Sequence, residues 1–211
     1  MTEVNSRMQE AVRHLAAADA LVRSSLAWIK QQCAGSKGVS NDKLDEHQVA
    51  SFDLAWCAAE STGARFAAEY ASKFAASASP TADACLEERM ALIFCAEALQ
   101  NIGNRLSARP QSFGLSDADL TSLTTPELRR FCQSQLAADK LEALGREVIA
   151  LNGASGAYML SDDATMMQDS FRKLATNVVM PLAEEIHRED RIIPQEILEP
   201  LTEMGCFGLS I

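Results

Sequence analysis

The sequence from Ser161 to Ile211 reads SDDATMMQDSFRKLATNVVMPLAEEIHREDRIIPQEILEPLTEMGCFGLSI, and it decides the fold that we expect for this part of the chain. Ser161 is a favourable N-cap, and the two aspartates after it lie where a helix dipole favours negative charge. Pro181 falls inside this helix, and because proline lacks an N–H group we expect it to bend or divide the helix. A polar hinge near Asp190, a second helix entered at Pro194 and a glycine-spaced apolar end follow.

Four short motifs occur in this segment. They are DSFRKLA at 169–175, PLAE at 181–184, HREDRIIP at 187–194 and EMGCFGLSI at 203–211. In this order and spacing, they make the segment resemble the N-terminal helical part of flavin-dependent acyl-CoA dehydrogenases. The resemblance covers about a quarter of the chain.

Enzymes of that family oxidise an acyl-CoA thioester at its α and β carbons. The resemblance therefore implies FAD as cofactor, an acyl-CoA substrate, an electron-transfer flavoprotein as partner and a homo-oligomer. In the family, the flavin, the CoA and the catalytic glutamate are held mainly by parts that follow this segment, so no position here matches a catalytic or flavin-contacting residue. We assign no catalytic residue, leave the cofactor-binding residues unknown, and expect the 211-residue chain alone to bind no FAD and to be inactive.

About 150 residues precede the resembling segment, whereas an ordinary member of the family starts close to Ser161. A helical extension of this kind resembles the subgroup that acts on a short, branched dicarboxylic acyl-CoA. Residues 51–60, SFDLAWCAAE, are also similar to a helix of the family's C-terminal bundle. Because Phe207, Leu209 and Ile211 are apolar and domain ends are usually polar, we expect the chain to be truncated.

Composition favours an all-α protein. Alanine contributes much of the 47% hydrophobic content, aromatic residues make up 6%, and runs of β-branched residues are rare. The formal net charge of −10 opposes binding to nucleic acid and to anionic lipid surfaces, and the N-terminus has no apolar secretory core. The six cysteines form no C-x-x-C pair, so we interpret them as reduced core residues of a cytoplasmic protein.

Periodic apolar residues predict an antiparallel helical bundle over residues 1–151. The first helix covers about 3–33, with the stripe Met8, Val12, Leu15, Asp19, Val22, Leu26, Ile29 and Cys33. The second begins after Ser40 or Asn41, and we expect its stripe to pack in the core: Phe52, Trp56, Ala59, Gly63, Phe66, Tyr70 and Phe74.

In the later helices of the bundle, residues that favour a helix N-terminus indicate where each helix begins. The third begins at Pro80 and continues to about Ser107, and Ser116 with Asp119 fits a cap on a short helix. Thr125 precedes a final helix that we expect to continue to about Leu151. We interpret residues 152–160, which begin with NGASG, as a linker before the truncated domain at 161–211.

Several constellations suggest chemistry, but each has a simpler interpretation. Glu184 and His187 have the E-x-x-H spacing of di-iron bundles, yet a second copy is lacking, so we predict no metal site and interpret these residues as a solvated polar face. Asp19 is expected to pair with Arg23 one turn later. The adjacent acidic pairs Glu87–Glu88 and Glu184–Glu185 are interpreted as solvated charge. The alternative interpretation is that the chain is not part of an enzyme but a non-catalytic helical module for interaction or assembly.

Overall fold

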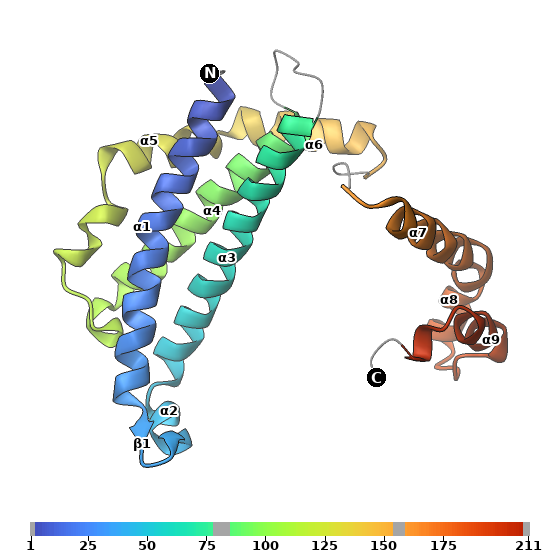
Figure 1. Cartoon of the computed structure of the whole chain (residues 1–211), viewed down its shortest axis with the longest axis horizontal. Helices are drawn as coiled ribbons and strands as arrows, with labels where there is room; N and C mark the ends of the chain where they lie inside the picture. Colours follow the sequence, from blue (N-terminus) through green and yellow to red (C-terminus); the bar gives the residue numbers. More distant parts are fainter. Residues whose placement is uncertain (1–2, 78–84, 154–158, 209–211) are drawn as a thin grey trace. The chain divides into compact units, whose positions relative to one another are not determined.

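The computed structural model describes residues 3–77, 85–153 and 159–208 of the chain. The chain divides into two compact units, Met1–Ala157 and Tyr158–Ile211. The described residues are almost wholly helical, which confirms the predicted all-α class (Figure 1). The exception is a two-residue antiparallel pair, β1 (Ala34–Gly35) with β2 (Gly38–Val39).

Three long helices form the core of the first unit. They are α1 (Glu3–Gln32), α3 (Gln48–Ser77) and α4 (Leu86–Ala108), and consecutive members are antiparallel (Figure 1). The β1–β2 turn and the short helix α2 (Asn41–Glu46) connect α1 to α3. The expected helix start at Pro80 lies outside the described residues.

Small side chains face the centre of this bundle. Alanines at 11, 18, 64, 68, 71, 91, 96 and 98 are buried, as are Cys57 and Cys95. Because small residues let helix axes approach closely, α3 and α4 have the most extensive helix-to-helix contact in the unit. The predicted α1 stripe was wrong at Val12 and Leu26, which are exposed, because Ala11, Ala18 and Ser25 occupy the inner face instead.

The predicted aromatic stripe of α3 does not face the core. Phe52 is 61% exposed, Trp56 47% and Phe66 56%, so the prediction that this stripe packs inside the bundle was wrong. The buried face of α3 is a second stripe, whose members lie about two residues before those of the predicted stripe. It consists of Ala50, Leu54, Cys57, Ser61, Ala64, Ala68 and Ala71.

The last helix predicted for this unit, from Thr125 to about Leu151, is divided into two helices in the structure. Two helices, α5 (Pro126–Gln135) and α6 (Ala138–Ala150), replace the single helix expected up to about Leu151. Ala137 is extended, with φ −60° and ψ 135°, and separates them. Leu128 and Phe131 of α5 are buried against the core, whereas no residue of α6 is buried.

The helix start predicted at Thr125 is confirmed, whereas the single helix expected after Ser40 or Asn41 is divided at His47 into α2 and α3. The Ser40 hydroxyl accepts from the backbone N–H of Lys43, and the Thr125 hydroxyl accepts from that of Leu128 at 3.2 Å. Ser116 donates its hydroxyl to Asp119 at 2.6 Å, before the 3-10 helix η2 (Asp119–Leu123).

Glu88 contradicts its interpretation as solvated charge. It is buried in the first turn of α4, where its carboxylate accepts from the backbone N–H of Cys85 at 3.1 Å. An acidic side chain there satisfies one of the free N–H groups that every helix start presents.

Gly114 ends the 3-10 helix η1 (Pro110–Phe113) in the left-handed region, with φ 68°. A Cβ atom at this position would lie 2.3 Å from the indole ring of Trp28 on α1. Glycine is therefore required here both for the backbone conformation and for the approach of the ring.

The second unit consists of α7 (Asp162–Leu174), a π-helical turn (Ala175–Val179), α8 (Met180–Arg188), α9 (Gln195–Glu203) and the 3-10 turn η4 (Cys206–Gly208). Ser161 caps α7 through the N–H of Ala164, as predicted. The π-helical turn precedes Pro181, where the helix was expected to bend or divide, because proline cannot donate the N–H that a regular turn needs.

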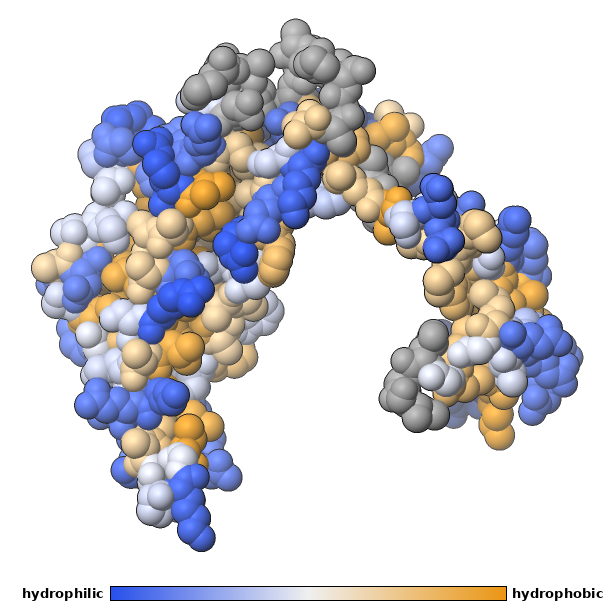
Figure 2. Space-filling view, viewed as in Figure 1, coloured by the Kyte–Doolittle hydropathy of each residue, from blue (hydrophilic) through white to orange (hydrophobic). Residues whose placement is uncertain are grey.

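Few apolar side chains of this second unit are buried. Ile197 is 6% exposed, whereas Met166, Met180 and Ile192 are exposed at 67–93%. Apolar side chains reach the surface in both units (Figure 2).

Candidate functional site

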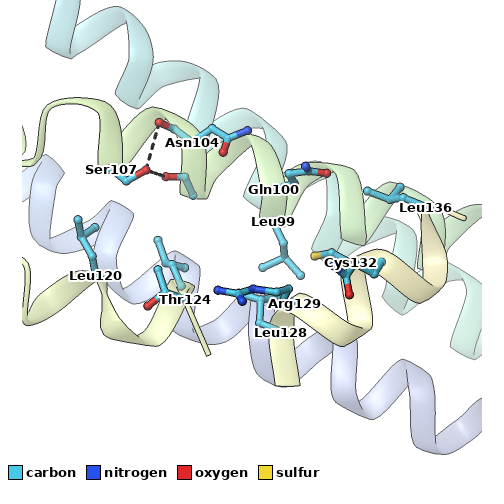
Figure 3. A pocket seen from close by; sticks show the side chains of 13 residues that line it. Leu99, Gln100, Asn104, Ser107, Leu120, Thr124, Leu128, Arg129, Cys132 and Leu136 are labelled. Atoms are coloured by element: carbon cyan, nitrogen blue, oxygen red, sulfur yellow. Dashed lines mark hydrogen bonds between the residues drawn. The ribbon is translucent and has the colours of Figure 1, made fainter. Parts of the chain in front are cut away.

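A groove beside α4 is a concavity of the first unit that could hold a ligand. Its volume is about 650 Å³, and it is formed by α4, η2 and α5 (Figure 3). Leu99, Leu120 and Leu128 are buried and supply apolar lining. The predicted start of α5 at Thr125 positions one wall of this groove.

Polar groups from α4 and α5 line the same groove. Gln100 and Asn104 extend from α4, and Arg129 is the single charged residue among those that line it. Ser107 is already engaged, because its hydroxyl donates to the carbonyl of Gly103 at 2.6 Å (Figure 3).

The chemistry available in the groove is binding rather than catalysis. Its lining includes no Asp, Glu or His that could move a proton. Its one thiol, Cys132, has a pKa raised above the ordinary value by burial, and a thiol is nucleophilic only as thiolate. The groove could hold a small ligand with an apolar body and an anionic end, but it presents no activated nucleophile.

A charged cluster joins α3 to the end of α4. Asp53 is buried; one carboxylate oxygen accepts from Arg105 at 2.7 Å and the other accepts from Arg109. Arg105 also lies over the ring of Trp56, with its guanidinium carbon 5.7 Å from the ring centroid. Because both oxygens accept from arginines, the cluster ties α3 to the end of α4.

The cysteines are free, consistent with their interpretation as reduced residues. Burial raises the pKa of Cys57 to about 11 and that of Cys95 to about 12. The Cys95 thiol donates to the carbonyl of Ala64 at 3.6 Å. These thiols stay protonated near neutral pH and act as small packing groups.

The other charged residues that the sequence singled out form ion pairs or hydrogen bonds with neighbouring side chains. Arg23 donates to Asp19 at 2.6 Å, which confirms the predicted pair, and Ser61 of α3 donates to the same carboxylate. Glu184 is 81% exposed and pairs with Arg188. Over the described residues, no group of three or more His, Cys, Asp or Glu side chains is placed to hold a metal ion.

Two comparisons relate the chain to known proteins. Residues 161–211 match the family described as acyl-CoA dehydrogenase, N-terminal domain. These residues belong to the acyl-CoA dehydrogenase family. The chain is also similar to (2S)-methylsuccinyl-CoA dehydrogenase of Cereibacter sphaeroides, with 31% identity over 209 residues. That alignment covers 92% of this chain and 35% of the relative, so the chain spans about a third of its length.

The acyl-CoA dehydrogenase segment is the part that sequence motifs identified, and its helices follow those motifs. DSFRKLA lies at the end of α7 and enters the π-helical turn, and PLAE lies in the first turns of α8. HREDRIIP includes Asp190, which has φ 51° and marks the hinge before α9. In the linker, Asn152 and Gly153 also have positive φ, while Ala154–Gly156 lie outside the described residues.

The groove of the first unit was not found from the sequence. Its lining residues come from α4, η2 and α5, and no spacing within any one helix indicates that they meet. No described helix has both the length and the apolar character needed to cross a membrane.

Proposed function

We propose that the chain is the N-terminal part of an FAD-dependent acyl-CoA dehydrogenase, and that the longer protein dehydrogenates (2S)-methylsuccinyl-CoA between its α and β carbons. The observation that carries this proposal is the extent of the similarity. The family match begins at residue 161, but similarity to (2S)-methylsuccinyl-CoA dehydrogenase covers 92% of the chain. The relative therefore shares the helical extension as well as the family segment.

The structure supports a proposal in which the flavin site lies outside this chain, in another part of the longer protein. The groove of the first unit does not fit a flavin dinucleotide, because it offers one arginine for two phosphates and no helix N-terminus with a glycine-rich turn at its edge. In the longer protein, FAD would supply the hydride acceptor for this reaction. We assign the flavin, the CoA and the base that removes the α proton to the part of the protein that corresponds to the remaining length of the relative.

The residues of this chain contribute structure to that site. Phe171, Leu174 and Leu182 are half-buried, which leaves apolar area on α7 and α8 available for further packing. Burial of such side chains contributes roughly 1.5 to 3 kcal/mol each. Removal of residues 161–211 from the longer protein should therefore lower its stability and its flavin retention together, whereas removal of 1–151 should leave the flavin bound.

Steady-state assays with the full coding product test the proposal. With an artificial electron acceptor, we expect a higher kcat/KM for (2S)-methylsuccinyl-CoA than for butyryl-CoA or for a long straight-chain acyl-CoA. A preference for the straight-chain substrates would refute the substrate assignment but keep the family reaction. Absence of acceptor reduction with every acyl-CoA tested, in a folded protein that retains FAD, would refute the reaction itself.

A second candidate, an assembly role for the extension, is favoured by the exposed aromatic stripe of α3. The two candidates are compatible, because the extension can support assembly while the remaining protein performs the chemistry.

A further inference from the structure

A second cavity of the first unit gathers positive charge. It lies at the end of the bundle where α1 and α4 both begin, and residues of α5 and α6 complete its wall (Figure 1). Arg7 of α1, Arg89 of α4 and Lys140 of α6 line it, and none of the described residues that line it is an aspartate or glutamate. The chain has 29 acidic and 19 basic residues, so a cavity lined by three cations departs from its composition. Positive charge at a concave site favours an anionic ligand.

Two acidic side chains outside the lining offset part of this charge. Glu147 of α6 accepts from Arg89 at 2.5 Å, and Asp139 precedes Lys140 in the chain. Burial, and then the charge of the Arg7 guanidinium, nevertheless lower the pKa of Lys140 below its ordinary value, and the opposing effect of Asp139 is smaller. The surroundings of Lys140 therefore disfavour its positive charge, and a bound anion relieves that effect.

Hydrogen-bond donors at this cavity remain available for a ligand. The Nε atom of Arg89 is buried and has no hydrogen-bond partner among the described residues. Lys140 donates to the hydroxyl of Ser134 at 3.2 Å and to the side-chain oxygen of the buried Gln135 at 3.5 Å. Its ammonium group carries three N–H bonds, so one is left for a further acceptor. A buried donor without an acceptor is unfavourable, and a ligand oxygen supplies the missing acceptor.

The size and the walls of the cavity limit the ligand. Its volume is about 170 Å³, and liquid water occupies about 30 Å³ per molecule, so the space corresponds to roughly six water molecules. Leu92 and Ile93 are buried in its wall, and Leu144 of α6 adds apolar surface. The cavity therefore fits a small molecule with one oxyanion and a short aliphatic body. A helix of the longer protein, which is about 10 Å across, is too wide to enter it.

We propose that this cavity binds a small oxyanion, a carboxylate or phosphate group on a short body. Arg89 donates to the anion through Nε while its Nη2 stays on Glu147, and Lys140 donates through its remaining N–H. Arginine and lysine are suited to this role, because their charged N–H groups bind carboxylate and phosphate oxygens strongly.

The proposed ligand also connects three helices. No residue of α6 is buried, so apolar packing contributes little to holding this helix on the bundle. An anion shared by Lys140 with Arg7 and Arg89 ties α6 to α1 and α4. The site shares no lining residue with the groove that contains Arg129, and the inference does not depend on the proposed dehydrogenase reaction.

Isothermal titration calorimetry of the 211-residue chain and of the full coding product tests the proposal, with sodium butyrate and inorganic phosphate as separate probes. The variant is Lys140→Gln. Its matched control is Arg146→Gln, which removes one positive charge from the same helix at a position that is 72% exposed and lies outside the cavity. We expect at least one probe to bind, with a Kd that rises at least about tenfold in Lys140→Gln and is unchanged in the control. Tighter binding of butyrate identifies a carboxylate ligand, and tighter binding of phosphate identifies a phosphate ligand.

Chemical labelling of Lys140 locates the site independently. A probe at about ten times its Kd leaves about a tenth of the sites free, so acetylation of Lys140 by an amine reagent should slow about tenfold. Lys37, which is exposed in the turn between β1 and β2, should react at an unchanged rate. Quantitative mass spectrometry of the peptides measures both rates, in the 211-residue chain and in the full coding product.

Three results would overturn the proposal. They are the binding of neither probe, equal Kd values for Lys140→Gln and its control, and acetylation of Lys140 at the same rate with and without probe. Binding by the 211-residue chain but not by the full coding product would also overturn it, because a side chain of the longer protein then occupies the cavity. Far-UV circular dichroism verifies that Lys140→Gln is folded, and Arg7→Gln, on a different helix, should weaken the same probe.

Discussion

Substitution of Gly114 by alanine adds one methyl group and should strongly destabilise the first unit. The backbone is left-handed at this residue, with φ 68°, and an L-residue in that region costs about 1 to 2 kcal/mol. The new Cβ atom would also lie 2.3 Å from the indole ring of Trp28, well inside van der Waals contact. Displacement of a packed side chain costs about 1 to 3 kcal/mol. The two effects together predict a loss of about 2 to 5 kcal/mol in the free energy of unfolding.

Urea denaturation followed by tryptophan fluorescence measures this loss. The chain has two tryptophans, Trp28 and Trp56, and both lie in the first unit, so the signal reports that unit. The matched control is Gly145→Ala in α6, where no atom lies within 4 Å of the added Cβ. This control should gain about 0.5 to 1 kcal/mol, because alanine is a better helix residue than glycine.

A double-mutant cycle separates the two causes. In a Trp28→Ala background the ring is absent, so Gly114→Ala should then cost only the backbone contribution of about 1 to 2 kcal/mol. If Gly114→Ala unfolds at the same urea concentration as the wild type, or if its cost is the same in both backgrounds, the account of the Gly114–Trp28 contact is wrong.

Three further outcomes are expected from the charged and sulfur-containing groups of the first unit. Asp53→Asn should lower the free energy of unfolding by about 1 to 3 kcal/mol, less than for a fully buried pair because Arg105 and Arg109 are partly exposed; an unchanged urea midpoint would contradict this. In the native chain, Cys57 and Cys95 should react with a thiol reagent only after unfolding, whereas Cys206 reacts early. Quantitative mass spectrometry of labelled peptides measures the order of reaction. Labelling of Cys57 and Cys95 before Cys206 would contradict the protection by burial. Because the pKa values of Cys57 and Cys95 are raised to about 11 and 12 from 9.0, stability should be fully present below about pH 9 and fall as the pH rises through 9 to 12, since the unfolded chain loses these protons first; Cys57→Ala should show a smaller decline.

The helices and their starts could be predicted because local signals specify them. Thr125 and Ser161 each cap a helix that the sequence indicated, and the π-helical turn occurs beside Pro181. These features depend on residues within one or two turns of each other. Local hydrogen bonding therefore determines them before any tertiary contact is known.

The orientation of α3 could not be predicted, because this helix has two apolar stripes. The stripe with large rings has the stronger hydrophobic pattern, but the stripe of alanine, cysteine and leucine is the buried one. Close packing against the alanines of α4 decides between them, and that contact joins residues far apart in sequence. The break at Ala137 has the same origin, since no glycine or proline marks it.

The residues that line the groove could not be predicted from the sequence either, because they come together only through tertiary packing. Leu99, Leu120 and Leu128 come from three different elements, and each fits a core position within its own helix. Their meeting depends on how the segment after α4 folds back along it. The family segment was identifiable because its motifs are contiguous, and family membership does not depend on packing.

Anaerobic titration of the purified full-length protein with (2S)-methylsuccinyl-CoA tests the central claim most directly. We predict that the full coding product retains FAD and that substrate bleaches the flavin absorbance, while the 211-residue chain prepared in parallel is colourless. Full-length protein that retains FAD but is not reduced by this or any other acyl-CoA would contradict the proposed reaction. A 211-residue chain with stoichiometric flavin would contradict the proposed assignment of the flavin to the remaining part of the protein.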